Sequence, residues 1–462
     1  MKTRPKPFVF PEFCKGCGRC IGVCPKGCIH FASDVNPLSG MIPIELELDA
    51  CNGCGLCITA CPEPYGLKPM EPDMNFELVD PATVNGPRRT TAQSPVTIPG
   101  ERIPMPPIEP LVIKGTYASA IGALLAGCRH FFGYPITPST EGAELMAKLL
   151  PDLDGVFLQA VSEVAAVNYM YGCSGAGLPC MTFTSSPGFS LMLEGISYMI
   201  GAQLPAVFVN VMRGGPGLGN IGPEQADIKL VCRGLGHGNT HALVLAPASP
   251  QEMLDLTMLA FELTFKYRSP VIVVGDGYMG QMTGKVKLPN TMRKPGIPDW
   301  AVYGDAMHRS NVITSIMLIE ADLEKHNEMI NRKYREMSLN EQRADLFNCE
   351  DASTLVIAAN TPARMAKGAV EELRNKGMRV GLFRPITLWP FPIDLLRPLL
   401  DHISQIIVVE AGNGQLEDEL RLSLSQNNLA FKNIDHVRHF GGVLPQKDEI
   451  VQKILSMEEV IA

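Results

Sequence analysis

Apolar and polar positions follow one rhythm from residue 111 onward, where short unbroken apolar runs alternate with longer segments whose apolar positions recur at helical spacing. Unbroken runs are typical of strands buried on both faces, and the longer segments are typical of helices that cover them. The predicted helices span residues 115–127, 163–171, 190–203, 251–266 and 363–376. The predicted strands span residues 155–161, 181–184, 206–212, 270–274, 355–359, 380–383 and 405–410. This order predicts an α/β fold with mostly parallel sheets.

Two segments interrupt this rhythm and divide the chain into domains. Residues 69–110 include ten prolines and few apolar repeats, which predicts an extended linker rather than a folded unit. Residues 286–350 begin with proline-rich turns and continue into a charged stretch, where Leu323, Ile330 and Tyr334 have the spacing of a surface helix. This second segment is predicted to connect two α/β domains. The predicted domains span residues 1–75, 76–110 (the linker), 111–285, 286–350 (the connector) and 351–462.

Nine of the 14 cysteines lie within the first 61 residues, in an internal repeat. The runs CKGCGRCIGVCP and CNGCGLCITACP both read C-x2-C-x2-C-x3-C-P, the spacing of two-cluster ferredoxins. In that arrangement, three close cysteines of one run share a [4Fe–4S] cluster with the last cysteine of the other run. The expected ligands of the first cluster are Cys14, Cys17, Cys20 and Cys61. The expected ligands of the second cluster are Cys51, Cys54, Cys57 and Cys24.

Other roles for these cysteines fit less well. Zinc sites usually pair two separated Cys-x2–4-Cys halves rather than three cysteines in a row. Disulfide frameworks belong to small secreted domains, whereas this chain is long and has no recognisable export signal. Cys28 belongs to neither ligand set and is predicted to be a buried structural thiol. Glycines at positions 16, 18, 53 and 55 are expected to let the backbone turn tightly around each cluster.

The composition narrows the possible function classes. The chain has 40 Lys and Arg residues and 48 Asp and Glu residues, so its formal charge is -8. It also has no basic block, which argues against nucleic-acid binding. No apolar stretch approaches the roughly 18 residues that a membrane helix needs. We therefore expect a cytoplasmic protein without a membrane span.

Two glycine-rich motifs are assigned no chemistry. Gly275-Asp276-Gly277 matches the start of the GDG…N signature by which thiamine-diphosphate enzymes hold magnesium and diphosphate, but no convincing asparagine follows. A turn at the end of a strand is the expected role of Asp276. The stretch RGGPGLG from Arg213 is not a Rossmann fingerprint, because prolines interrupt the helix that such a loop should open.

Three further segments resemble the α subunit of the 2-oxoacid:ferredoxin oxidoreductases, which are thiamine-diphosphate and iron–sulfur enzymes related to pyruvate:ferredoxin oxidoreductase. These segments are GYPITPSTE from Gly133, TFTSSPG from Thr182, and VMRGGP from Val211 with Glu224 and Gln225. The first domain is similar to that family's ferredoxin-type subunit, and GLFRPITLWPFP from Gly381 is similar to its transketolase-C-like domain. The resemblance implies a small two-cluster ferredoxin-like domain, then a thiamine-diphosphate-type pyrimidine domain, then a transketolase-C-like α/β domain.

The resemblance also implies an activity. Such enzymes decarboxylate a 2-oxoacid oxidatively with thiamine diphosphate, pass the acyl group to coenzyme A, and release electrons through [4Fe–4S] clusters. A β subunit is expected to hold the diphosphate and Mg²⁺, a γ subunit to help with coenzyme A, and ferredoxin or another low-potential carrier to accept the electrons. Anaerobic metabolism is the expected setting, because exposed clusters do not survive in air.

Five residues receive roles from the resemblance. Glu163 matches the glutamate that contacts N1′ of the aminopyrimidine; the alternative is a helix N-terminal glutamate stabilised by the dipole. Thr137 matches a residue whose hydroxyl faces substrate, and the alternative is a turn threonine fixed by prolines. Arg213 matches a position that grips the substrate carboxylate, and the alternative is a solvated arginine at a strand end. Ser185 and Ser186 are expected to line the same pocket through backbone groups.

The sequence departs from the pyruvate-oxidising members at two segments. TSSPG stands where they resemble TASQG, and GPGLG replaces a polar, threonine-bearing loop. Both forms are closer to the 2-ketoisovalerate (branched-chain) and 2-oxoglutarate branches, so the 2-oxoacid stays open. Three other interpretations also stay open: an electron-transfer or docking subunit without a catalytic role, a catalytically inactive paralogue, and an indolepyruvate- or arylglyoxylate-type relative.

Overall fold

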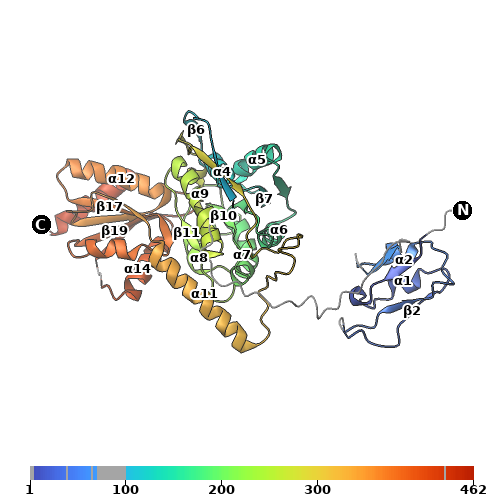
Figure 1. The fold of residues 1–462 in the computed structure, drawn as a ribbon. Helices are drawn as coiled ribbons and strands as arrows, with labels where there is room; N and C mark the ends of the chain where they lie inside the picture. Colours follow the sequence, from blue (N-terminus) through green and yellow to red (C-terminus); the bar gives the residue numbers. More distant parts are fainter. Residues whose placement is uncertain (1–4, 38–39, 64–65, 70–99, 431–432, 462) are drawn as a thin grey trace. The chain divides into compact units, whose positions relative to one another are not determined.

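The computed structural model describes residues 5–37, 40–63, 66–69, 100–430 and 433–461 (Figure 1). The chain divides into two compact units, Met1–Gly86 and Pro87–Ala462. Most of the predicted linker, residues 70–99, lies outside the described residues.

The first unit consists of two antiparallel strand pairs and two short helices. The pairs are β1 (Pro7–Val9) with β4 (Leu67–Pro69), and β2 (Ile29–Phe31) with β3 (Ile44–Leu46). Helices α1 (Arg19–Gly22) and α2 (Leu56–Ala60) each follow a glycine with a left-handed backbone, Gly18 with φ +70° and Gly55 with φ +79°. Glycine adopts this conformation without a steric penalty, so the chain turns sharply within each cysteine run.

The second unit is built around a seven-stranded sheet in the order β18-β11-β12-β10-β9-β7-β8. Every neighbouring pair is parallel except β18 with β11. The strands are β7 (His130–Gly133), β8 (Val156–Gln159), β9 (Cys180–Thr184), β10 (Val207–Met212), β11 (Leu243–Leu245), β12 (Val271–Asp276) and β18 (Thr387–Trp389). The four central strands β9 to β12 are buried throughout, as strands covered on both faces should be.

Helices cover both faces of this sheet (Figure 1). They are α4 (Gly115–Leu125), α5 (Thr140–Leu149), α6 (Glu163–Gly175), α7 (Ser186–Gly201), α8 (Asp227–Arg233), α9 (Pro250–Tyr267) and α10 (Gly277–Gln281). Helix α4 packs on α9, and α6 packs on α7. Helices α4 and α9 approach closely because Gly122 has no side chain. A Cβ built on Gly122 would lie only 2.6 Å from the carbonyl oxygen of Leu254.

A five-stranded sheet in the order β15-β17-β16-β19-β20 forms the second α/β domain of this unit. Its strands are β15 (Ala344–Phe347), β16 (Thr354–Ala358), β17 (Val380–Pro385), β19 (Gln405–Ala411) and β20 (Ile434–His439). Its helices are α12 (Asn360–Asn375), α13 (Ile393–Leu396), α14 (Gln415–Gln426) and α15 (Lys447–Ile461). Helix α12 packs on α15, and α14 lies on the opposite face of the sheet (Figure 1).

The predicted linker and connector both contribute ordered strands. In the linker range, β5 (Gly100–Pro104) pairs with β14 (Thr291–Pro295), and just after it β6 (Leu111–Lys114) pairs with β13 (Thr283–Val286). In the connector range, β15 joins the C-terminal sheet through β17. The connector also contains α11 (Glu320–Asn340), where Ile330 and Tyr334 are buried but Leu323 is 40% exposed.

The two α/β domains of the second unit are joined by polar contacts. Nδ2 of Asn360 donates hydrogen bonds to the carbonyl oxygens of Pro247 and Val274, at 3.0 and 2.7 Å. The guanidinium of Arg384 bonds both carboxylate oxygens of Glu252, at 2.7 and 2.9 Å. Strand β18 adds to this junction, because it leaves the C-terminal domain to become the edge strand of the large sheet.

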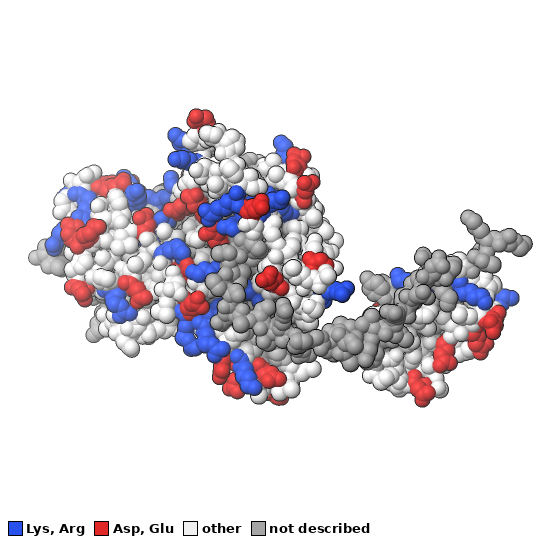
Figure 2. All heavy atoms as spheres, in the orientation of Figure 1, with Lys and Arg blue, Asp and Glu red and all other residues white. Residues whose placement is uncertain are grey.

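The surface in Figure 2 carries acidic and basic side chains in mixed order. This distribution agrees with the absence of any basic block in the sequence. Within the part of the chain that the structure describes, no helix combines the length and the apolar character that crossing a bilayer requires.

Candidate functional site

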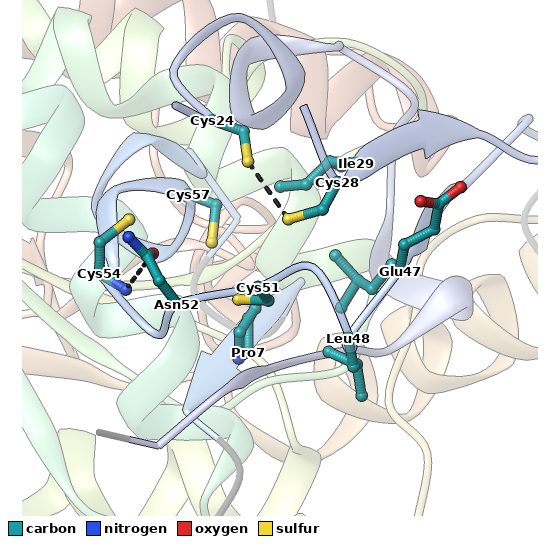
Figure 3. Close-up of a pocket in the computed structure, with 12 residues that line it drawn as sticks. Pro7, Cys24, Cys28, Ile29, Glu47, Leu48, Cys51, Asn52, Cys54 and Cys57 are labelled. Atoms are coloured by element: carbon teal, nitrogen blue, oxygen red, sulfur yellow. Dashed lines mark hydrogen bonds between the residues drawn. The ribbon is translucent and has the colours of Figure 1, made fainter. Parts of the chain in front are cut away.

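The cysteines of the first unit surround two separate hollows. The first hollow lies between the two repeats (Figure 3). Four cysteines of one expected ligand set line it: Cys24, Cys51, Cys54 and Cys57. Cys28 lines the same hollow, so the structure places five thiols there.

The second hollow is lined by the other expected ligand set. It is lined by Cys14, Cys17, Cys20 and Cys61. Each hollow therefore takes three cysteines from one run and the last cysteine from the other run. Among the described residues, no three Cys, His, Asp or Glu side chains converge as closely as ligands of a single metal ion do.

In the second unit, the predicted site residues lie beyond the carboxyl ends of four neighbouring parallel strands. Thr137 follows β7, Glu163 follows β8, Ser185 and Ser186 follow β9, and Arg213 follows β10. These strands are adjacent in the order β10-β9-β7-β8. In parallel α/β sheets, ligands bind at this edge, so the topology gathers these residues at one ligand-binding edge.

Glu163 is the first residue of α6 and its side chain is only 5% exposed. The preceding Ser162 caps the helix by accepting a 3.2 Å hydrogen bond from the amide of Ala165. A Cβ built on Gly188 would lie 2.5 Å from Oε1 of Glu163 and 2.5 Å from Oγ1 of Thr184. The Glu163 carboxylate therefore fits here because position 188 has no side chain.

Thr184 is a site residue that the sequence analysis did not single out. Its side chain is fully buried, and its hydroxyl has no hydrogen-bond partner among the described residues. A buried polar group without a partner is costly, so such a group points to a ligand that completes it. Its signal in the sequence was its place at the end of an apolar strand, directly before the two serines.

Arg213 is 9% exposed, and its guanidinium is held by main-chain carbonyl groups. Nη1 donates to the carbonyl oxygen of Thr137 at 2.7 Å, and Nη2 donates to that of Leu218 at 3.1 Å. Nε is buried without a partner, and no carboxylate of the described residues forms an ion pair with Arg213. A nearly buried cation with only neutral partners attracts an anion. The alternative of a solvated arginine does not hold.

Ser185 and Ser186 hold the end of β10 with their hydroxyl groups. Oγ of Ser185 donates to the carbonyl oxygen of Val211 at 2.8 Å, and Oγ of Ser186 accepts from the amide of Arg213 at 3.0 Å. These hydroxyls therefore position Arg213. Thr137 is exposed, so its hydroxyl is free to face a ligand.

The loop after Arg213 contacts the C-terminal domain. Nδ2 of Asn220 donates to the carbonyl oxygen of Gly441 at 2.9 Å, and the amide of Gly441 donates to Oε2 of Glu224 at 2.6 Å. Burial raises the pKa of Glu224 above its usual range. Asn220 could not be recognised from the sequence, because its partner Gly441 lies more than two hundred positions away.

Asp276, the acidic residue of the GDG motif, is used for structure. Its Oδ1 accepts hydrogen bonds from the amides of Tyr278 and Met279 at 3.0 and 2.9 Å, which caps α10. The same oxygen accepts from Oγ1 of Thr361 at 2.8 Å, and Oδ2 accepts from the amide of Thr361 at 2.9 Å. Complete burial raises the pKa of Asp276, against these hydrogen bonds. Its carboxylate thus joins the two α/β domains.

Family models match three stretches of the chain. The thiamine-diphosphate-binding domain of the pyruvate flavodoxin/ferredoxin oxidoreductases matches residues 121–338. Core domain II of pyruvate:ferredoxin oxidoreductase matches residues 352–450, and the 4Fe-4S dicluster domain matches residues 13–64.

Two curated relatives match over nearly their whole length. The chain is 44% identical to ketoisovalerate oxidoreductase subunit VorB of Methanothermobacter thermautotrophicus over 345 residues, which is 74% of this chain and 96% of that one. It is 34% identical to 2-oxoglutarate synthase subunit KorA of Methanocaldococcus jannaschii over 368 residues, 74% of this chain and 98% of that one. The chain belongs to the 2-oxoacid:ferredoxin oxidoreductases.

A solved member of this family has a similar fold. The 2-oxoglutarate:ferredoxin oxidoreductase from Magnetococcus marinus, with 2-oxoglutarate, coenzyme A and succinyl-CoA bound, matches with a TM-score of 0.68 and 26% identity. The match covers 75% of this chain and 65% of that chain. The predicted family, fold class and reaction class are confirmed. This 2-oxoacid:ferredoxin oxidoreductase chain is one subunit of a multi-subunit enzyme, and it carries a 4Fe-4S dicluster domain together with a thiamine-diphosphate domain.

Proposed function

We propose that this chain is the α-type subunit that holds the pyrimidine half of thiamine diphosphate, with Glu163 as the residue that contacts its N1′. The observation that carries the proposal is the buried Glu163 carboxylate beside the unpartnered hydroxyl of Thr184. Both groups suit an aminopyrimidine ring, whose nitrogens donate and accept hydrogen bonds. A carboxyl group within hydrogen-bonding reach of a ring nitrogen can exchange a proton with it.

Thiamine diphosphate, when bound, supplies the nucleophilic carbon and the electron sink for decarboxylation. The contribution of this chain is to hold a proton at Glu163 and to orient the substrate. Arg213 offers its free guanidinium edge to the carboxylate of the 2-oxoacid, a geometry for which arginine is suited. The hydroxyl of Thr137 faces the same substrate.

Electrons leave through two [4Fe–4S] clusters in the first unit. The proposed ligands are Cys14, Cys17, Cys20 and Cys61 for one cluster. The proposed ligands are Cys51, Cys54, Cys57 and Cys24 for the other cluster. The support is that each set lines its own hollow. Ferredoxin or another low-potential carrier is the proposed acceptor.

The rest of the active site comes from partner subunits. Asp276 is committed to helix capping and to Thr361, so it is not a free ligand for Mg²⁺. We therefore assign the diphosphate and Mg²⁺ to a β subunit and help with coenzyme A binding to a γ subunit.

The proposed substrate is a branched-chain 2-oxoacid of the 2-ketoisovalerate type. Identity is 44% to a ketoisovalerate oxidoreductase subunit and 34% to a 2-oxoglutarate synthase subunit. The loop over residues 214–222, directly after Arg213, carries no charged side chain. It therefore offers no second cation for the distal carboxylate of 2-oxoglutarate.

The test is turnover of the complex purified from its host without oxygen. Several 2-oxoacids are offered with coenzyme A, and viologen reduction is followed. Glu163→Gln is expected to lower turnover by about 10² or more, the range of a lost general acid–base, with iron and sulfide content unchanged. The control is Glu144→Gln, an exposed glutamate on α5. Full turnover in Glu163→Gln would show that the α/β domains serve only electron transfer or docking.

A further inference from the structure

One thiol of the first hollow belongs to neither proposed ligand set. Cys28 is 3% exposed, and its Sγ lies 3.4 Å from Sγ of Cys24, a hydrogen-bonding distance for sulfur (Figure 3). Cys28 lines the hollow together with Cys24 and the three cysteines of the second run. A [4Fe–4S] cluster takes four cysteine ligands, so one of the five thiols is left for another task.

The second hollow has no thiol at the related position. In both repeats, the residue directly before a strand lies against the last cysteine of its run: Cys28 before β2, and Gly66 before β4. A Cβ built on Gly66 would lie 3.1 Å from Sγ of Cys61, so this position contacts Cys61 as Cys28 contacts Cys24. The pseudo-symmetry of the repeats is therefore broken by one sulfur atom.

We propose that the Cys28 thiol donates a hydrogen bond to the Cys24 sulfur and thereby raises the reduction potential of the cluster in the first hollow. The inference rests on the proposed ligand sets. A ligating sulfur has no proton of its own, so Cys28 is the donor of the pair. Reduction makes the cluster more negative, and a hydrogen bond to a ligating sulfur stabilises that state. Gly66 supplies no such donor to Cys61.

The proposed hydrogen bond affects one cluster and not the other. This hydrogen bond shifts the distribution of an electron between the two clusters toward the cluster in the first hollow. Cys28 thus acts on the reduction potential of the cluster through Cys24 and is not itself a ligand.

The test is an EPR-monitored redox titration of the whole complex without oxygen. In Cys28→Ala, the reduced-to-oxidised ratio of one cluster at a fixed potential should fall about three- to tenfold, the range that one net hydrogen bond supplies. A tenfold change corresponds to about 59 mV for a one-electron couple. The other cluster should keep its potential. Cys28→Ser, which keeps a hydroxyl donor, should recover part of the shift, and Cys349→Ala, outside the cysteine runs, should show none.

A second readout separates a hydrogen bond from packing. An exchangeable proton coupled to the reduced cluster should appear in proton ENDOR spectra of the natural chain and of Cys28→Ser, and should disappear in Cys28→Ala. Two intact clusters with unchanged potentials in Cys28→Ala would overturn the inference. Loss of half of the iron in Cys28→Ala would also overturn it, because Cys28 would then be a ligand. A natural chain without iron and sulfide would instead refute the proposed ligand sets.

Discussion

Nη1 of Arg213 donates a 2.7 Å hydrogen bond to the main-chain carbonyl oxygen of Thr137, across the carboxyl ends of two different strands. This bond uses the backbone of Thr137 and leaves its hydroxyl available. The two residues are therefore separable by mutation, although they lie side by side.

Thr137→Val should lower kcat/KM for the 2-oxoacid about tenfold, since one hydrogen bond to the substrate is lost, without a change in the unfolding temperature. Arg213→Lys should raise KM more strongly, because an ammonium group cannot bond two carbonyl oxygens and still present a planar edge to a carboxylate. Steady-state kinetics of the complex and a thermal melt check both variants. An unchanged KM in Arg213→Lys would exclude Arg213 as the carboxylate-binding group.

Gly188→Ala should displace the Glu163 carboxylate, because the new methyl group would meet both Oε1 of Glu163 and Oγ1 of Thr184 at 2.5 Å. We expect thiamine diphosphate affinity to fall at least tenfold, measured by titrating the depleted complex with the cofactor. The matched control is Gly172→Ala on α6, where an added Cβ meets no atom within 4 Å. Equal cofactor affinity in both variants would contradict the placement of the ring at Glu163.

Exchange of ligands between the two cysteine runs can be tested directly. In Cys61→Ala, the cluster bound by Cys14, Cys17 and Cys20 should be lost, although Cys61 belongs to the other run. About half of the iron should remain, and the EPR signal of one cluster should persist. Loss of the cluster of Cys51, Cys54 and Cys57 instead would mean that each run holds its own cluster.

Asp276→Ala should destabilise the chain and leave Mg²⁺ binding unchanged. The variant removes the cap of α10 and the bonds to Thr361, which together contribute on the order of 2–4 kcal/mol. The measurement is the thermal unfolding temperature beside the Mg²⁺ dependence of turnover. A normal melt combined with lost Mg²⁺ dependence would restore Asp276 as a metal ligand.

Glu419 should make the stability of the second unit depend on pH. Burial raises its pKa to about 7, although Nε of Arg233 lies 2.7 Å from its Oε1. Because the folded chain holds this proton more tightly than the unfolded chain, the stability contribution is full below about pH 4.5 and is lost as the pH rises through 7. Unfolding temperatures between pH 5 and 8 should fall less steeply in Glu419→Gln than in Asp401→Asn, the control with an exposed carboxyl. Equal slopes would refute this assignment.

The sequence predicts the strands that precede Glu163, Ser185 and Arg213, but not the strand that precedes Thr137. Glu163 and Arg213 were expected from the family resemblance, since the strand pattern alone left a helix N-terminal glutamate and a solvated arginine as alternatives. The sequence shows that Thr184 ends an apolar strand, but it does not show that the hydroxyl of Thr184 is buried without a partner. The short strands β7 and β11 gave too few apolar positions to be recognised among the neighbouring helices.

The pattern of apolar positions also could not predict pairing between strands that lie far apart in the sequence. Residues 387–389 were expected within the C-terminal domain, and their antiparallel pairing with β11 depends on a contact between segments more than one hundred positions apart. The charged helix over Ile330 and Tyr334 was visible, because its buried positions repeat locally. Leu323 fits the same repeat but lies beyond the surface that α11 covers.

Because β18 crosses into the large sheet, the position at which this subunit is divided into fragments affects their solubility. A fragment that stops before residue 387 would leave the hydrogen-bonding edge of β11 open, and open edges recruit other chains into aggregates. A gene divided between the two α/β domains would therefore yield two aggregation-prone fragments, each of which needs the other for solubility. The cysteine-rich unit imposes no such penalty, because its strands pair only among themselves in the described residues. Cutting between the two compact units therefore opens no edge among these strands, whereas cutting between the two α/β domains opens the edge of β11.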